Sequence, residues 1–321
     1  MGYPHGSLRR VLPIGYYIDT MIVDLKTRVW ESDAQLGEAI QEQMRRRRGH
    51  PYVWPDGSTD AHDEAMADIG CAVIHGFESF LLDVVIGPEK VASWSKRNPK
   101  KYLGFMGIDP TVGNPVDRLA QGLDLGLVGV TLSPAAAGFH PADSRAMALY
   151  QACEARSVPV YFDSNTISAR QVKMEFAQPH LLDEVARCFP QLRIAISSLG
   201  DPWIMEGLAL IGKHPTIYAD LSSLVLSPWQ LHNALLMAYY QQATTQLVFG
   251  SGFPFCRPAD AMVTIYSTNT LTQGTHLPNI PRELLRSIIE RNTLGCLGLS
   301  RPDLDAAHPT PPGARTTPIH T

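Results

Sequence analysis

Short apolar segments recur along the chain, and stretches with helical periodicity separate them. Each segment is rich in β-branched or aromatic residues and is apolar on both faces, which is typical of strands buried in a parallel sheet. The pattern predicts eight such strands, at 15–24, 70–77, 102–108, 127–133, 158–164, 192–198, 215–222 and 246–252. The last contains Leu-Val-Phe-Gly-Ser-Gly and stops abruptly before Phe253-Pro254.

Three of the intervening segments have clear helical patterns. Residues 143–156 place four apolar side chains on one face, those of Ala146, Leu149, Tyr150 and Cys153. Residues 179–189 follow a proline suited to a helix start. Residues 281–298 open with proline and an acidic residue and close on a glycine. These segments are predicted to be helices.

Eight strands alternating with helices favour a single (β/α)₈ TIM barrel, for which roughly 250 residues is typical. A doubly wound open sheet is the alternative fold, but no Gly-x-Gly-x-x-Gly follows the first strand and no P-loop occurs. We expect an N-terminal arm at 1–14, the barrel at 15–299 and a flexible, Pro-rich tail at 300–321. The long connection 25–69 is predicted to be an insertion at the C-terminal mouth of the barrel.

Composition excludes several classes of protein. Apolar residues make up 45% of the chain, charged residues 18%, and the net charge is −4, so neither disorder nor a nucleic-acid partner is indicated. The basic run 45–48 is interpreted as the solvated end of an amphipathic helix. The five cysteines are scattered, and no apolar run approaches the roughly 18 residues of a membrane span. We predict a cytoplasmic protein without a membrane partner.

Four strand ends and the last helix carry motifs of a known family. They read IDTMIV at 18–23, PVYFDSN at 159–165, SSLGDPW at 197–203, FGSGFP at 249–254 and IERN at 289–292. The chain resembles the amidohydrolase superfamily, in the amidohydrolase-related branch that contains aminocarboxymuconate-semialdehyde decarboxylase. The corresponding family patterns at the first four are I-D-x-H-x-H, P-V-x-x-H-x-G, H-x-G-G-P-W and F-G-S-D-x-P. The resemblance implies a TIM barrel and a hydrolase or decarboxylase ancestry.

The resemblance also implies a divalent-metal site, and this chain departs from it at each ligand position. Residues of other types stand where the family has its histidines and its last aspartate, namely Met21, Val23, Asp163, Ser198 and Gly252. A catalytic zinc needs about three N, O or S donors, and only Asp163 is a strong ligand. We therefore expect vestigial metal positions, no metal and no cofactor.

Other residues are candidates for a site that works without a metal. Asp163, predicted to lie beside apolar Met21 and Val23, should have a raised pKa and could act as a general base. His75 lies inside the second strand and His140 on a loop after the fourth, and either could assist, although a histidine in an apolar strand is more often part of the core. None of the predicted strands contains a lysine, which argues against a Schiff-base aldolase.

Three functions remain open. The first is a non-hydrolytic pseudoenzyme with a binding, regulatory or assembly role, either as a homodimer or in a complex with an intact paralogue. The second is a metal-independent lyase or hydrolase that uses Asp163 on a small organic or aromatic acid. The third is a metal enzyme with relocated ligands drawn from His50, His62 and the nearby acidic residues.

Overall fold

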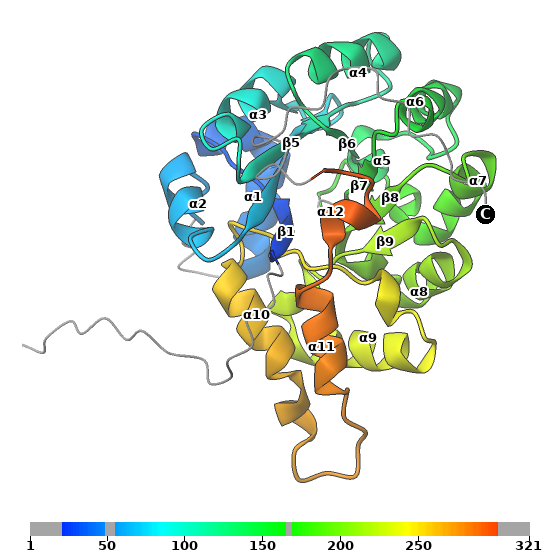
Figure 1. Cartoon of the computed structure of the whole chain (residues 1–321). Helices are drawn as coiled ribbons and strands as arrows, with labels where there is room; N and C mark the ends of the chain where they lie inside the picture. The colour runs from blue at the N-terminus through cyan, green and yellow to red at the C-terminus, as the bar shows by residue number, and fades with distance from the viewer. Residues whose placement is uncertain (1–20, 49–54, 165–168, 301–321) are drawn as a thin grey trace, which may run out of the picture.

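The computed structural model describes residues 21–48, 55–164 and 169–300. Seven parallel strands form one curved sheet in the order β1-β2-β5-β6-β7-β8-β9 (Figure 1). Their bounds are β1 Val23–Thr27, β2 Cys71–His75, β5 Tyr102–Gly107, β6 Gly129–Leu132, β7 Val160–Phe162, β8 Ile194–Ile196 and β9 Ile217–Ala219. The predicted arm at 1–14 and all but the first residue of the predicted tail at 300–321 lie outside the described residues.

The eighth predicted strand closes the sheet into a barrel. Val248 N donates to Ala219 O on β9 (2.9 Å), and Leu25 N on β1 donates to Phe249 O (3.0 Å). The segment makes isolated bridges rather than a continuous ladder, from Leu247 to β9 and from Phe253 to β1. The chain therefore forms the predicted (β/α)₈ TIM barrel, with its last strand reduced to bridges.

Helices surround the ring of strands (Figure 1). The α-helices are α1 Gly37–Arg48, α2 Thr59–Ala65, α3 Pro88–Ser95, α4 Pro115–Asp124, α5 Pro134–Ala137, α6 Ser144–Ala155, α7 Leu182–Cys188, α8 Ile204–Lys213, α9 Pro228–Tyr240, α10 Pro258–Tyr266, α11 Arg282–Ile289 and α12 Thr293–Cys296. Short 3₁₀ helices are η1 Asp33–Leu36, η2 Met174–Ala177, η3 Pro179–Leu181, η4 Ser197–Gly200, η5 Leu224–Leu226, η6 Thr244–Gln246 and η7 Thr268–Thr272. No helix in the described part of the chain is long and apolar enough to cross a membrane.

Two of the three predicted helical segments are helical throughout, and one is interrupted. α6 buries the four apolar side chains of its predicted face, and η3 with α7 covers the segment that begins at Pro179. The predicted helix 281–298 breaks in two, because the Asn292 side chain accepts a hydrogen bond from Gly295 N and starts α12 afresh. In Figure 1 α12 lies across the centre of the ring, where Leu294 packs against Val23 and Cys71.

Two features of the first third of the chain differ from prediction. The first strand begins at Val23 rather than at residue 15, and residues 15–20 lie outside the described part. A hairpin of β3 (Phe77–Ser79) and β4 (Val84–Ile86) follows β2, and its strands are too short for an alternating pattern to reveal. The connection after β1 is long, as predicted, and carries η1 and α1 before α2.

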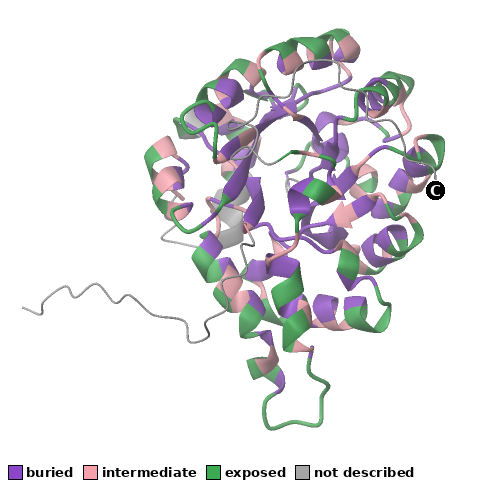
Figure 2. Cartoon of the chain, in the orientation of Figure 1, coloured by how far each residue is buried: buried purple, intermediate pink, exposed green. Residues whose placement is uncertain are grey.

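The core has two layers. Inside the barrel a small cluster fills the lumen, with Leu25, Val73, Phe105, Tyr161, Ala195 and Val248. A larger cluster lies between the strands and the surrounding helices, so that the strands are buried on both faces (Figure 2). This arrangement explains why the strands read as apolar runs rather than as alternating ones.

Helix α8 offers a matched test of this packing at two glycines. A Cβ on Gly207 would lie 2.1 Å from the carbonyl oxygen of Leu199 in η4, whereas a Cβ on Gly212 would meet nothing within 4 Å. We expect Gly207→Ala to lower the free energy of unfolding by about 2–4 kcal/mol, because backbone must move. Gly212→Ala should raise it by up to about 1 kcal/mol, since alanine favours the helix. Urea unfolding of both variants measures the difference, and equal effects would contradict the close approach.

Candidate active site at the barrel mouth

A β-bulge in β1 determines which side chains reach the barrel mouth. The three-residue step from Asp24 to Thr27 faces the two-residue step from Ala72 to Ile74 on β2. An extra residue in one strand interrupts the alternation of inward and outward side chains. Leu25 and Lys26 therefore both point inward, Leu25 into the lumen cluster and Lys26 over the ring of Tyr161.

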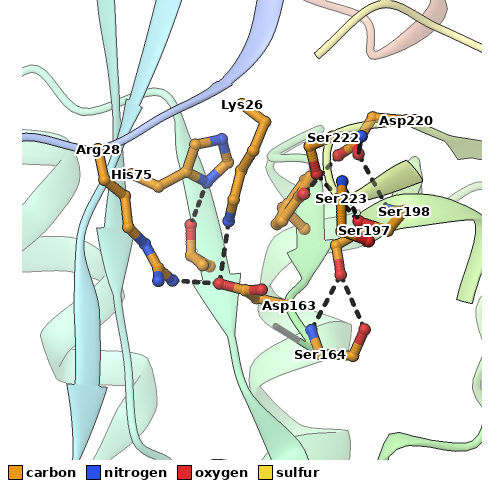
Figure 3. A network of polar contacts seen from close by, with 12 residues as sticks. Lys26, Arg28, His75, Asp163, Ser164, Ser197, Ser198, Asp220, Ser222 and Ser223 are labelled. Carbon is orange, nitrogen blue, oxygen red and sulfur yellow. Dashed lines mark hydrogen bonds and ion pairs between the residues drawn. The ribbon is translucent and has the colours of Figure 1, made fainter. Parts of the chain in front are cut away.

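Lys26 and Arg28 meet at the carboxylate of Asp163, and we call these three residues the mouth triad (Figure 3). Lys26 Nζ lies 2.9 Å from Asp163 Oδ2, and Arg28 Nη2 contacts the same oxygen. The side chains of Lys26 and Asp163 are only 3% and 1% exposed, and that of Arg28 is 12% exposed. The triad is an almost fully buried arrangement of two cations around one carboxylate.

The triad corrects two predictions made from the sequence. Met21 and Val23 do not face Asp163: Val23 packs with Leu294 at the opposite end of the barrel, and Met21 lies against the same cluster. Asp163 therefore has two cations beside it rather than apolar side chains, which removes the stated reason for a raised pKa. The prediction that no strand carries a lysine is also wrong, because Lys26 lies within β1.

The sequence contains a second motif that fits the first-strand pattern of the family. Asp24-x-Lys26-x-Arg28 has the same spacing as the D-x-H-x-H part of the family pattern, and it begins five residues after Asp19, the aspartate aligned with that pattern above. The structure favours the later alignment, because β1 contains it. Lysine and arginine then stand where the family has its two histidines.

Aromatic rings and burial determine the electrostatics of the triad. Lys26 Nζ lies 4.5 Å from the centroid of Tyr161, and Arg28 Cζ lies 4.7 Å from the centroid of Phe77. Burial, assisted by the Arg28 charge, lowers the pKa of Lys26 to about 8, although Asp163 opposes this shift. Asp163 thus holds two cations in a place with little access to water.

A divalent metal does not fit this site. Two positive groups already occupy the carboxylate of Asp163, the only strong ligand among the five positions taken from the family pattern. A metal ion there would face uncompensated repulsion from both. Within the described residues there is also no group of three or more His, Cys, Asp or Glu side chains that could hold a metal.

Asp220 and a group of serines form the other half of the rim (Figure 3). Asp220 Oδ1 accepts from Ser198 N (2.9 Å) and Ser222 N (2.8 Å), and Tyr161 Oη donates to its Oδ2. The hydroxyls of Ser198 and Ser222 lie 3.1 Å apart. Ser198, a predicted vestigial position, is therefore part of a network that connects the ends of β8 and β9.

Gly252, the other predicted vestigial position, is required by the backbone. Its φ is +75°, a conformation that residues with a Cβ rarely adopt. A Cβ there would lie 3.1 Å from the carbonyl oxygen of Ser222, and Gly252 N donates to Lys26 O at 3.0 Å. The glycine thus allows the last strand to close against both neighbours, and an aspartate would be strained at this position.

His75 is a buried structural residue of the barrel. Its Nε2 lies 2.7 Å from Leu25 O and its Nδ1 lies 2.7 Å from Thr131 Oγ1. Burial holds its pKa well below the usual value, so the ring is neutral, with Nε2 donating to the carbonyl and Nδ1 accepting from the hydroxyl. Both nitrogens are used to join β1, β2 and β6.

The remaining candidates lie apart from the triad. His140 is exposed, accepts from Ala142 N and packs edge-on against Phe176. His62 is buried against Tyr102 and Phe253, with Nε2 3.1 Å from Thr27 Oγ1. His50 lies outside the described residues. Among the described residues, His62 and His140 do not come together with other ligands as a relocated metal site.

Asp24 is a buried carboxyl group that sequence reasoning missed. Its Oδ1 accepts from Lys26 N and Ser251 N, while its Oδ2 has no partner among the described residues. Burial raises its pKa to about 7. It therefore ties the first strand to the last beneath the mouth triad.

A small cavity adjoins the triad. It measures about 30 Å³ and borders Asp163, Ser164, Phe176, Pro179 and Ser197. A larger hollow of about 460 Å³ lies beside α2, lined by polar residues that include Asp56, Asp60 and Arg257. Of these two hollows, the small one borders Asp163 and the larger one borders no residue of the triad.

The fold and its rim define a TIM-barrel protein of the kind that places enzyme sites at the C-terminal ends of its strands. A family model described as amidohydrolase matches residues 88–298. The chain belongs to the amidohydrolase family, which confirms the resemblance inferred from its strand-end motifs. No curated protein matches the chain.

Several solved structures share the fold. An uncharacterised TIM-barrel protein from Bordetella bronchiseptica is 21% identical, with a TM-score of 0.66 over 87% of this chain and 99% of that one. The 5-carboxyvanillate decarboxylase from Sphingomonas paucimobilis is 13% identical, with a TM-score of 0.58 over 88% and 100%. The 2,6-dihydroxybenzoate decarboxylase from Rhizobium is 13% identical, with a TM-score of 0.57 over 87% and 99%. At these identities the likeness establishes the fold alone.

Removal of the Asp163 charge should destabilise the barrel strongly. We expect Asp163→Asn to lower the free energy of unfolding by about 3–5 kcal/mol, because Lys26 and Arg28 then remain buried without a carboxylate. Glu31→Gln is the matched control: it breaks the exposed ion pair with Lys90 and should cost no more than about 1 kcal/mol. Urea unfolding measures both. Similar effects of the two substitutions would show that the triad contributes little.

His62 should make the protein acid-sensitive. Burial lowers its pKa to about 4, whereas unfolded histidine titrates near about 6.5. Between these values the unfolded state binds more protons, so stability falls as the pH drops from about 6.5 to 4, by about 2 kcal/mol at pH 5. His62→Gln should flatten that part of the pH profile in urea unfolding. His140→Gln, at an exposed site, should not; a slope unchanged by His62→Gln would contradict the assignment.

Proposed function

We propose that this protein binds a small organic acid at the barrel mouth, through Lys26 and Arg28 and without a divalent metal. The observation that carries the proposal is the mouth triad, in which two buried cations share one carboxylate. Its formal charge is +1, so a second carboxylate would balance it. Such a site favours an organic acid over a metal ion.

Arg28 is the residue that we expect to contact the acid first. It is the most exposed member of the triad, and its Nε–H is buried without a partner among the described residues. A guanidinium binds a carboxylate with two parallel hydrogen bonds. The acid would thus satisfy a donor that the folded chain leaves unused.

The proposal gives Asp163 a role different from that of a general base. The carboxylate holds Lys26 and Arg28 in place at the mouth, while the nitrogens of His75 bond Leu25 O and Thr131 Oγ1 and His140 accepts from Ala142 N. We therefore infer that the protein does not hydrolyse a substrate with a metal-activated water molecule. Organic-acid binding is consistent with the names of two structural neighbours, which act on 5-carboxyvanillate and 2,6-dihydroxybenzoate.

Isothermal calorimetry with 2,6-dihydroxybenzoate and with lactate tests the proposal. We expect at least one acid to bind equally well before and after treatment with a chelator. Arg28→Gln should weaken that binding at least about tenfold, which is about 1.4 kcal/mol, because the bidentate contact is lost. Arg145→Gln is the matched control, since Arg145 is exposed and pairs with Asp143, and it should have no effect.

Two results would overturn the proposal. The first is binding that disappears with the chelator and returns with added zinc or manganese. The second is that neither acid binds the wild-type protein, although circular dichroism shows it folded. Arg28→Lys separates the effect of charge from that of geometry. It should bind the acid more tightly than Arg28→Gln but less tightly than the wild type, because lysine keeps the positive charge but lacks the planar guanidinium group.

A further inference from the structure

Lys26 differs from every other lysine of the sequence. All lysines lie in the described part of the chain, and Lys26 is the only buried one. It stands at the C-terminal end of a barrel strand, where TIM-barrel proteins place reactive groups. Burial of a charged lysine side chain lowers the stability of the folded state, so we expect Lys26 to have a function that an exposed lysine would not have.

The groups around Lys26 suit an amine that reacts with a carbonyl. Asp163 Oδ2, 2.9 Å from Nζ, can take a proton from the ammonium group. The face of Tyr161 shields the nitrogen from water, and Arg28, just after the end of β1, contacts the same carboxylate. An acid bound by Arg28 would bring its neighbouring carbon close to Nζ.

We propose that Lys26 forms a reversible imine with a 2-oxo carboxylic acid whose carboxylate binds Arg28. The proposal rests on the organic-acid site proposed above and adds covalent chemistry to it. Desolvation is a recognised way to make a lysine nucleophilic, and the lowered pKa of Lys26, about 8, is consistent with it.

The step balances in atoms and charge. The ammonium gives one proton to Asp163, and the free amine attacks the carbonyl carbon, so that a C–N bond forms. The carbonyl oxygen receives two hydrogens from the original ammonium, one by way of Asp163, and leaves as water. The nitrogen keeps one hydrogen and the positive charge, as an iminium ion. No oxidant, reductant or metal is needed.

The size of the site restricts the acid. The cavity beside Asp163 is about 30 Å³, enough for about two water molecules. This cavity borders Asp163 but not Lys26 or Arg28, so a 2-oxo acid must open further space beside these two side chains to reach Nζ. The probe should therefore be one of the smallest 2-oxo acids, and we choose pyruvate. Lactate is its analogue with a hydroxyl in place of the 2-oxo group.

Borohydride trapping tests the proposal on the wild-type full chain. The protein is incubated with pyruvate at pH 8, reduced with sodium borohydride, digested and mapped by mass spectrometry. We expect one reduced pyruvate adduct on the peptide that contains Lys26, and at least about tenfold less after preincubation with excess lactate. Arg28→Gln should lower the yield at Lys26 to a similar extent, whereas Lys96→Arg, at an exposed lysine, should not change it.

The outcomes separate this proposal from the proposed function. If lactate binds in an Arg28-dependent manner but no adduct forms on Lys26, the imine is overturned and the acid site stands. If adducts appear only on exposed lysines, the result also overturns it. If neither lactate nor 2,6-dihydroxybenzoate binds and no adduct forms, both proposals fail. The wild-type map needs no variant, so misfolding of a mutant cannot obscure the result.

Discussion

The contact of Lys26 and Arg28 with Asp163 is the interaction on which the barrel mouth depends. It joins β1 to the end of β7 across the lumen, beside Tyr161, which belongs to the apolar filling of the barrel. Ion pairs at this depth stabilise only when each member keeps its partner. One carboxylate therefore holds two buried cations at the end of β1, where it faces both of them.

The bulge in β1 makes that contact possible. Without the extra residue, Lys26 would point away from Leu25 and out toward the helices, because neighbouring residues of a regular strand alternate. With it, the carbonyl of Leu25 is free to accept from His75, and Asp24 reaches the last strand through Ser251. A local irregularity of the backbone thus supplies the cation, the hydrogen bond that orients His75 and the closure of the barrel.

Three residues with positive φ lie on the part of the rim that runs from β8 through the last strand to β1. Ser198 and Leu199 both have φ of +52°, and Gly252 has φ of +75°. Asp220 holds Ser198 in this conformation by accepting a hydrogen bond from its N–H. Gly207 leaves room for the carbonyl oxygen of Leu199. A strained backbone conformation of this kind persists where the surrounding contacts hold it in place, and it is common at functional sites. Glycine at residue 252 is therefore a requirement of this rim rather than only the loss of an acidic group.

The sequence by itself determined the fold. Eight apolar runs, the helix at 144–155 and the family motifs were enough to predict a TIM barrel of the amidohydrolase family. The tertiary structure decided the site, because the apolar run at 15–24 overlaps the strand that forms at 23–27, and the polar residues of the second segment hide it from local periodicity. Sequence alone also predicts that a lysine in a strand is exposed. Only the pairing of Lys26 with Asp163, 137 residues away, accounts for its burial. Long-range charge pairing leaves no local pattern, so the triad became visible only in the folded chain.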